Sequence, residues 1–123
     1  MSASQASAAT AIAFQLSGAL EAYAAEVEQL AALRTEPEAY HRLRLQLDEM
    51  RRYSVELPSV SVAWVELLIR HFELAHALWK QQQGELAADA VLALHDSHRS
   101  CLAKLRAQCL RILQQDSAVP APL

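Results

Sequence analysis

Apolar residues recur at spacings of three and four along almost the whole of this 123-residue chain. The first such series is Ala9, Ile12, Ala13, Leu16, Leu20, Tyr23, Val27, Leu30 and Ala31. Because an α-helix completes a turn every 3.6 residues, this spacing places the side chains on one helical face. The chain has only 2 Gly and 4 Pro to interrupt the pattern, and 53% of its residues are hydrophobic although only 6% are aromatic. The pattern predicts an all-α fold.

Residues that start and stop helices divide the chain into segments. Thr35, Pro37 and Glu38 form a capping-box pattern, which predicts that a first helix ends near Thr35 and a second begins there. Pro58 ends the second helix, because proline disfavours a helical residue before it and cannot extend the hydrogen-bond ladder. The second helix is expected to face the core with Tyr40, Leu43, Leu47 and Met50.

Two further helices are expected after Pro58. Ser59 or Ser61 is predicted to cap the third helix, since a serine oxygen can accept a hydrogen bond from a free backbone amide there. Gly84 is predicted to end it in the left-handed conformation. The fourth helix then extends over about residues 85–115. Its apolar face comprises Ala87, Val91, Leu94, His98, Cys101, Leu105, Cys109 and Ile112.

The predicted architecture is an antiparallel up-down-up-down four-helix bundle, because short connections make consecutive helices antiparallel. We expect a single helical domain over residues 1–123, with residues 1–6 and 117–123 frayed at its ends. The alternative is a long kinked helical hairpin, in which the first two helices merge through Thr35 and the core is completed by dimerisation.

The charge distribution argues against some classes of partner. A net charge of -3 and a pI near 5.9 do not suit nucleic acid, which calls for an excess of Lys and Arg. The start of the chain lacks basic residues, and Gln15 and Glu21 interrupt the apolar stretch after it, so neither a signal peptide nor a membrane span is expected. Residues before Arg34 carry only acidic charges and residues 99–111 only basic ones, which favours packing of the first helix beside the fourth.

The two cysteines indicate a reducing compartment. Cys101 and Cys109 are eight residues apart in one expected helix, or about 12 Å along its axis at about 1.5 Å per residue. This separation is too long for a disulfide within that helix. We therefore expect reduced, buried thiols in a cytoplasmic protein.

The third helix is apolar over about 200° of its circumference, whereas a surface helix needs about 100°. One seam suits the bundle core: Trp64, Leu67, Leu68, His71, Ala75 and Leu78. We expect an interface formed by a second seam of this helix together with two leucines that point away from the main stripe of the fourth helix. Its residues are Val65, Ile69, Phe72, His76, Trp79, Leu92 and Leu110.

The exposed apolar surface suggests a function. Because large exposed apolar patches mark interaction sites, we predict a non-enzymatic protein-interaction module, an adaptor, chaperone-like or regulatory protein. It would form a homodimer or bind a partner helix. The alternative is that the third helix lies at the centre of an unevenly packed bundle.

A metal site is a second hypothesis. His71 and His98 lie on the core seams of their helices, thirteen and fourteen residues from Gly84, so a hairpin at Gly84 would bring them to a similar height. Cys101, one turn beyond His98, would join them, and imidazole with thiolate suits zinc or another transition metal. The alternative is two core histidines that hydrogen-bond each other or the backbone, beside a cysteine that acts as a small hydrophobic residue.

A third hypothesis concerns His76, in the segment Leu74-Ala75-His76-Ala77-Leu78-Trp79-Lys80. This segment resembles the region around the phosphorylated histidine of histidine phosphotransfer domains, which are four-helix bundles with the pattern His-x-Leu-Lys-Gly. Here the lysine is displaced by one position to Lys80, and the adjacent glycine that allows close approach of a response regulator is missing. The resemblance covers about ten residues and implies that His76 accepts phosphate, with Lys80 as the nearby cation.

Overall fold

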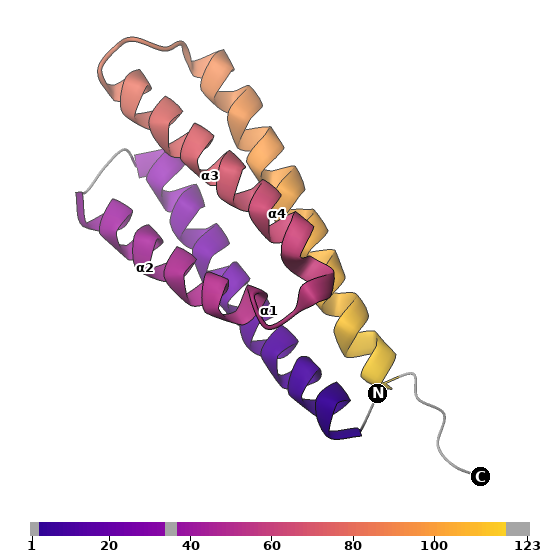
Figure 1. Ribbon diagram of the computed structural model, residues 1–123. Helices are drawn as coiled ribbons and strands as arrows, with labels where there is room; N and C mark the ends of the chain where they lie inside the picture. The colour runs from indigo at the N-terminus through magenta and orange to yellow at the C-terminus, as the bar shows by residue number, and fades with distance from the viewer. Residues whose placement is uncertain (1–2, 34–36, 118–123) are drawn as a thin grey trace.

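The computed structural model describes residues 3–33 and 37–117, which form four long helices and no strand (Figure 1). The helices are α1 (Ala3–Leu33), α2 (Pro37–Ser54), α3 (Ser61–Gln82) and α4 (Ala88–Ser117), and a 3-10 turn, η1 (Pro58–Val60), precedes α3. The predicted all-α four-helix bundle is confirmed. None of the described helices combines the length and apolar character needed to cross a membrane.

Contacts between α1 and α2 give their relative direction. Glu26, late in α1, pairs with Arg42, early in α2, whereas Gln15, in the first half of α1, and Tyr53, at the end of α2, line a common pocket. The two helices therefore lie side by side and run in opposite directions. Figure 1 shows the chain returning along α3 and coming back along α4. The alternative of a single long rod from the first two helices is wrong, because α1 and α2 pack against each other.

The core is built from one buried stripe of each helix. Burying a large aliphatic or aromatic side chain contributes about 1.5–3 kcal/mol, so these stripes supply the main stabilisation. The α1 stripe is Ala13, Leu16, Leu20, Tyr23, Val27 and Leu30, and those of α2 and α3 are Leu43, Leu47 and Met50, and Trp64, Leu67, His71 and Leu78. The α4 stripe includes Val91, His98, Cys101, Leu105 and Cys109. Tyr40, expected in the core, is only half-buried.

The start of α3 differs from the expectation that Ser59 or Ser61 caps it. The N-cap position is Val60, which makes no side-chain capping bond. The Ser61 hydroxyl instead donates back to the carbonyl oxygen of Pro58 at 3.0 Å. The reason is that η1 leads directly into α3, so Ser61 already has helical backbone angles and cannot occupy the cap position.

The end of α3 follows the prediction for Gly84, which has φ 75. The amide of Glu85 donates to the carbonyl of Lys80 at 2.9 Å, and the amide of Gly84 donates to that of Gln81 at 3.0 Å. These two bonds form the Schellman motif, which needs a residue in the left-handed region. The α4 helix begins at Ala88, three residues after the expected start at residue 85.

Other predicted boundaries lie partly outside the described residues. Thr35, the predicted cap of the second helix, lies outside the described residues. The α2 helix begins at Pro37, which agrees with the prediction that this proline lies in the first turn. At the chain start, α1 extends to Ala3, within the segment expected to fray, and α4 ends at Ser117.

Packing around the bundle is uneven, and this positions the candidate site. The α1 helix packs against both α2 and α4, and α3 packs mainly against α4. By contrast, α2 and α3 make few contacts with each other. A cavity of about 550 Å³ lies between them, with His71 in its wall.

Candidate functional site

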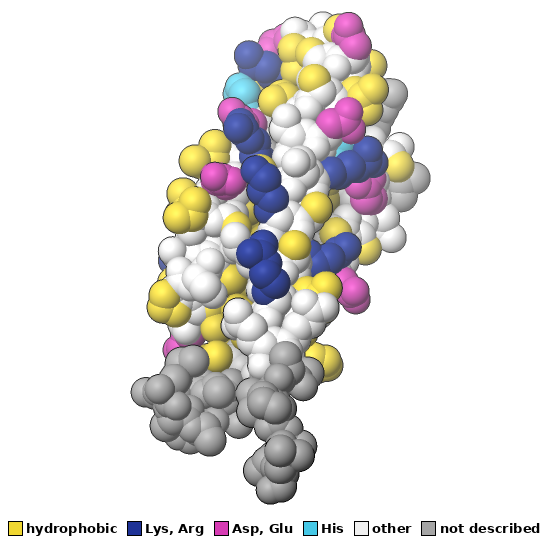
Figure 2. Space-filling view, turned by 90° about the vertical axis from the view of Figure 1, so that its right-hand side faces the viewer, with side chains coloured by type: hydrophobic (Ala, Val, Ile, Leu, Met, Phe, Trp, Pro, Cys, Tyr) yellow, Lys and Arg dark blue, Asp and Glu magenta, His cyan; other side chains and the backbone are white. Residues whose placement is uncertain are grey.

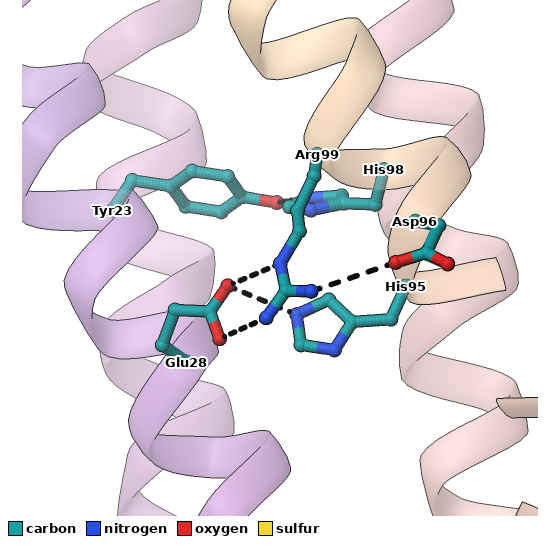
Figure 3. Close-up of polar contacts among 6 residues, drawn as sticks. All are labelled: Tyr23, Glu28, His95, Asp96, His98 and Arg99. Atoms are coloured by element: carbon teal, nitrogen blue, oxygen red, sulfur yellow. Dashed lines mark hydrogen bonds and ion pairs between the residues drawn. The ribbon is translucent and has the colours of Figure 1, made fainter. Parts of the chain in front are cut away.

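A buried tyrosine joins two buried histidines at the centre of the bundle. The Tyr23 hydroxyl oxygen of α1 lies 2.7 Å from Nδ1 of His71 on α3 and 2.8 Å from Nε2 of His98 on α4. Tyr23 and His98 are 0% exposed and His71 is 8% exposed. Figure 3 shows the Tyr23 ring from α1 reaching His98 across the interior. Three helices are therefore connected through one hydroxyl group.

The two histidines lie at the same level of the bundle, as predicted, but their hydrogen-bond partner is a tyrosine that was not predicted. His71 and His98 do come together across the α3–α4 hairpin, as their distances from Gly84 indicate. Sequence reasoning missed Tyr23, which was counted only as a member of the apolar stripe of α1. The available signal was chemical, because a buried tyrosine needs a hydrogen-bond partner for its hydroxyl.

The hydrogen-bond network assigns the protons of this centre. A tyrosine hydroxyl donates one hydrogen bond, so one histidine must accept from Tyr23 and the other must donate to it. Nδ1 of His98 is buried without a partner among the described residues. Because a buried unpaired N–H is rarer than a buried unpaired acceptor, we place the proton of His98 on Nε2. His98 then donates to Tyr23, Tyr23 donates to Nδ1 of His71, and His71 carries its proton on Nε2.

Burial keeps all three groups uncharged at neutral pH. It lowers the pKa of His71 from 6.5 to about 4. The pKa of His98 is also lowered to about 4, mainly by burial and further by the nearby His71. Burial raises the pKa of Tyr23 far above its usual value. The centre is a polar but neutral set of donors and acceptors, because burial penalises the charged form of each group.

The cavity beside this centre combines apolar walls with charged groups. Its α2 side includes Leu43, Leu47, Arg44 and Arg51, and its α3 side includes Trp64, Leu68, His71 and Phe72. The imidazole of His71 thus lines the cavity while its Nδ1 accepts from Tyr23. The only ring nitrogen of His71 available to a bound molecule is Nε2, which carries a proton in the assignment above.

A second polar cluster lies nearer the surface and connects α1 to α4 (Figure 3). Arg99 donates to both carboxylate oxygens of Glu28, from Nε at 2.9 Å and from Nη2 at 2.8 Å, and its Nη1 lies 3.5 Å from Asp96. Nε2 of His95 lies 3.1 Å from the same carboxylate. The hydrogen bond from Arg99 is the largest cause of the lowered pKa of Glu28. This cluster is the contact between acidic α1 and basic α4 that the charge pattern favours.

The predicted metal-ligand set is not assembled. The histidine nitrogens that face each other, Nδ1 of His71 and Nε2 of His98, are both occupied by Tyr23. Cys101 is buried in the core stripe of α4. Over residues 3–33 and 37–117, no three His, Cys, Asp or Glu side chains are placed to hold a metal ion.

The other cysteine is buried among apolar neighbours. Cys109 is fully buried, and burial raises the pKa of its thiol to about 11. A thiol with a raised pKa is a poor nucleophile, since the thiolate is the reactive form. Both cysteines are free thiols.

His76 lies on the exposed side of α3. Its imidazole stacks on the indole of Trp79, with ring centroids 6.1 Å apart and an angle of 20° between the planes. Exposure is one requirement for a phosphate-accepting histidine. The phosphotransfer hypothesis stays a prediction.

A continuous line of exposed side chains runs along α3, and we call it the α3 seam. Its five apolar members are between 49% and 71% exposed, although they include two of the largest side chains of the chain. The seam consists of Val62, Val65, Ile69, Phe72, His76 and Trp79. Leu92 and Leu110 of α4 are exposed to a similar degree, and their predicted interface role stays a prediction.

Figure 2 shows the side of the molecule on which α4 lies. Lys and Arg side chains follow one another along this face, with acidic groups beside some of them. The α4 sequence supplies Arg99, Lys104, Arg106 and Arg111. Because Arg99 is already paired with Glu28, part of this positive charge is neutralised within the bundle.

Comparison with models of known protein families, with curated proteins and with solved structures found no significant match.

Proposed function

We propose that this chain is a small protein-interaction module, of the adaptor, chaperone-like or regulatory type, that forms a homodimer through the α3 seam. The observation that carries the proposal is the exposure of this seam along more than four turns of a well-packed helix. Monomeric proteins rarely leave such a continuous apolar strip in water, because each exposed side chain forgoes the stabilisation of burial.

The spacing of the seam suits a partner helix. Its members follow one another at intervals of three, four, three, four and three residues. This is the 3.5-residue average of a coiled-coil seam, in which two helices cross at about 20°. The seam therefore favours a helix over a flat or irregular partner surface.

The order of large and small residues favours a second copy of the same helix. In an antiparallel pair, residues whose numbers add to the same sum lie opposite each other. With Ile69 opposite Phe72 of a second copy, Val65 faces His76 and Val62 faces Trp79. The rings of His76 and Trp79 thus each lie opposite a small valine of the second copy. The surface is therefore complementary to itself, as a two-fold interface requires.

We also propose a cytoplasmic location. Two free, buried thiols suit a reducing compartment, where disulfides are rare.

The proposal predicts that Ile69→Asp abolishes dimerisation. Ile69 lies at the middle of the seam and is 52% exposed in the single chain. A carboxylate buried there without a partner costs about 3 kcal/mol or more, which weakens association at least about 100-fold. Light scattering after gel filtration should give twice the 13.6 kDa chain mass for the natural chain and the mass of one chain for the variant. Circular dichroism should show the same helix content for both.

The matched control is Leu45→Asp, because Leu45 is 55% exposed on α2 and is not part of the seam. This variant should keep the dimer mass. A natural chain that stays monomeric at concentrations of about 100 µM, on the order of a weak specific complex, would refute the proposal. Equal loss of mass in Leu45→Asp and Ile69→Asp would refute the assignment to α3.

A further inference from the structure

The cavity between α2 and α3 has the size of a small-molecule site. Its volume of about 550 Å³ lies within the range of about 300–1,000 Å³ that ligand pockets occupy. It exists because α2 packs on α1 and makes few contacts with α3. Phe72 belongs both to the wall of this cavity and to the α3 seam, whereas the other lining residues lie outside the seam.

Its walls suit a hydrocarbon or aromatic body. Leu43 and Leu47 contribute from α2, and Trp64, Leu68 and Phe72 contribute from α3. Ligand pockets are lined mainly by such side chains, with a few polar groups that fix the orientation of the ligand. The apolar part of a ligand would therefore be held between the two helices.

The charged groups of the cavity carry a net positive charge. Asp48 lies 3.6 Å from Arg51, so these two side chains largely neutralise each other. Arg44 lines the same cavity, and no ion pair among the described residues includes it. A guanidinium group binds carboxylates through two parallel hydrogen bonds, so Arg44 favours an anionic head group.

A buried polar group adds a donor to this cavity. His71 is more than nine-tenths buried, lines the cavity and has its Nδ1 committed to Tyr23. Its Nε2–H is therefore the donor left for an acceptor atom inside the cavity. A site with one free arginine and one fixed imidazole donor selects an acceptor-bearing anion over a cation or a purely apolar molecule.

We propose that the α2–α3 cavity binds a single-chain amphipathic carboxylate, with Arg44 and His71 at the carboxylate head and Trp64, Leu68 and Phe72 around the hydrocarbon body. The proposed ligand is a single dissolved carboxylate rather than a lipid that is part of a membrane. A cavity of this volume holds one short chain, and binding to a bilayer would need an extended basic surface instead.

The test uses three probes with a straight chain of nine or ten carbons and different head groups: decanoate, decyltrimethylammonium and 1-decanol. Each is titrated into the full chain at pH 7, the two ionic probes below their micelle concentrations and the alcohol below its solubility limit. Binding is measured by calorimetry and by amide chemical shifts in NMR. Decanoate should bind at one site per chain and shift the resonances of α2 and α3. The cationic probe should not bind, and the alcohol should bind at least about 10-fold more weakly, because it lacks the charge-assisted hydrogen bonds.

Two variants locate the head group. Arg44→Gln should weaken decanoate binding at least about 10-fold, since it removes the charged donor. Arg106→Gln, which changes an exposed arginine of α4 outside the cavity, should leave binding unchanged. Ile69→Asp should also leave it unchanged, because Ile69 does not line the cavity, so this result separates ligand binding from dimerisation.

Several outcomes would overturn the inference. These are no saturable binding of decanoate, equal binding of decanoate and decyltrimethylammonium, and equal effects of Arg44→Gln and Arg106→Gln. Co-sedimentation with phosphatidylglycerol vesicles that exceeds co-sedimentation with phosphatidylcholine vesicles, and is lost in Arg44→Gln, would assign the site to a membrane lipid instead.

Discussion

Replacing Tyr23 with Phe is expected to lower the free energy of unfolding by about 3 kcal/mol, since two buried histidine nitrogens lose their shared partner. Each buried polar group left unpaired costs about 1–3 kcal/mol, whereas the phenyl ring keeps the packing of the tyrosine ring. The hydroxyl lies 2.7 Å from His71 and 2.8 Å from His98, so both bonds are lost together. Urea unfolding at pH 7, followed by circular dichroism, should show a lower midpoint with an unchanged slope.

Tyr53→Phe is the matched control for this experiment. Tyr53 of α2 is only half-buried, and its hydroxyl donates to Glu49 at 3.4 Å, close to the limit for a hydrogen bond. Its loss should change stability by less than about 0.5 kcal/mol. Equal destabilisation by the two substitutions would contradict the central role that we give to Tyr23.

Acidification is expected to destabilise the bundle steeply between about pH 6.5 and pH 4. The pKa values of His71 and His98 are lowered to about 4 in the folded protein, against 6.5 for an exposed histidine. Between these values the unfolded chain binds more protons than the folded one, so stability is full above pH 6.5 and is lost as the pH falls. Each histidine contributes up to about 1.4 kcal/mol per pH unit, or about 3 kcal/mol over this interval, so the two together contribute on the order of 7 kcal/mol. Small domains have a total stability of about 5–15 kcal/mol, so unfolding near pH 4 is expected.

The measurement is the unfolding free energy in urea at half-unit steps from pH 7.5 to pH 4.5. Removing one buried histidine in His71→Gln should reduce the slope by about half. Removing the exposed imidazole in His76→Gln should leave it unchanged. Glu28, whose pKa is lowered in the folded protein, contributes to acid unfolding only at lower pH. A flat profile above pH 5 would contradict the neutral state of the buried pair.

Periodicity was sufficient to predict the helices and most of the core, because burial of one face imposes a 3.6-residue repeat on the sequence. The α1 residues Leu16, Leu20 and Val27 are examples, and all three are buried. The similar height of His71 and His98 was also predictable, since Gly84 fixes the turn between their helices.

The position of Tyr23 was not predictable in the same way. In the sequence, α2 separates α1 from α3, and both α2 and α3 separate it from α4. No local signal therefore fixes the rotation of α1 about its axis, which decides where the Tyr23 hydroxyl points. The cavity was equally hidden, because it depends on the tilt of α2 against α3, which many weak side-chain contacts determine together. The Ser61 cap failed for a local reason, since η1 continues directly into the helix.

The loose fit of α2 against α3 makes α2 the part of the bundle that can separate at the lowest free energy. Amide hydrogen exchange should therefore be faster for α2 than for the segments of α1, α3 and α4 around Tyr23, and equal protection of all four helices would contradict this. Local opening of α2 leaves both hydrogen bonds of Tyr23 intact, because they join only α1, α3 and α4. These three helices therefore stay packed together while α2 moves away from α3. Such opening would widen the cavity between α2 and α3, which is already partly open to solvent, without global unfolding of the chain.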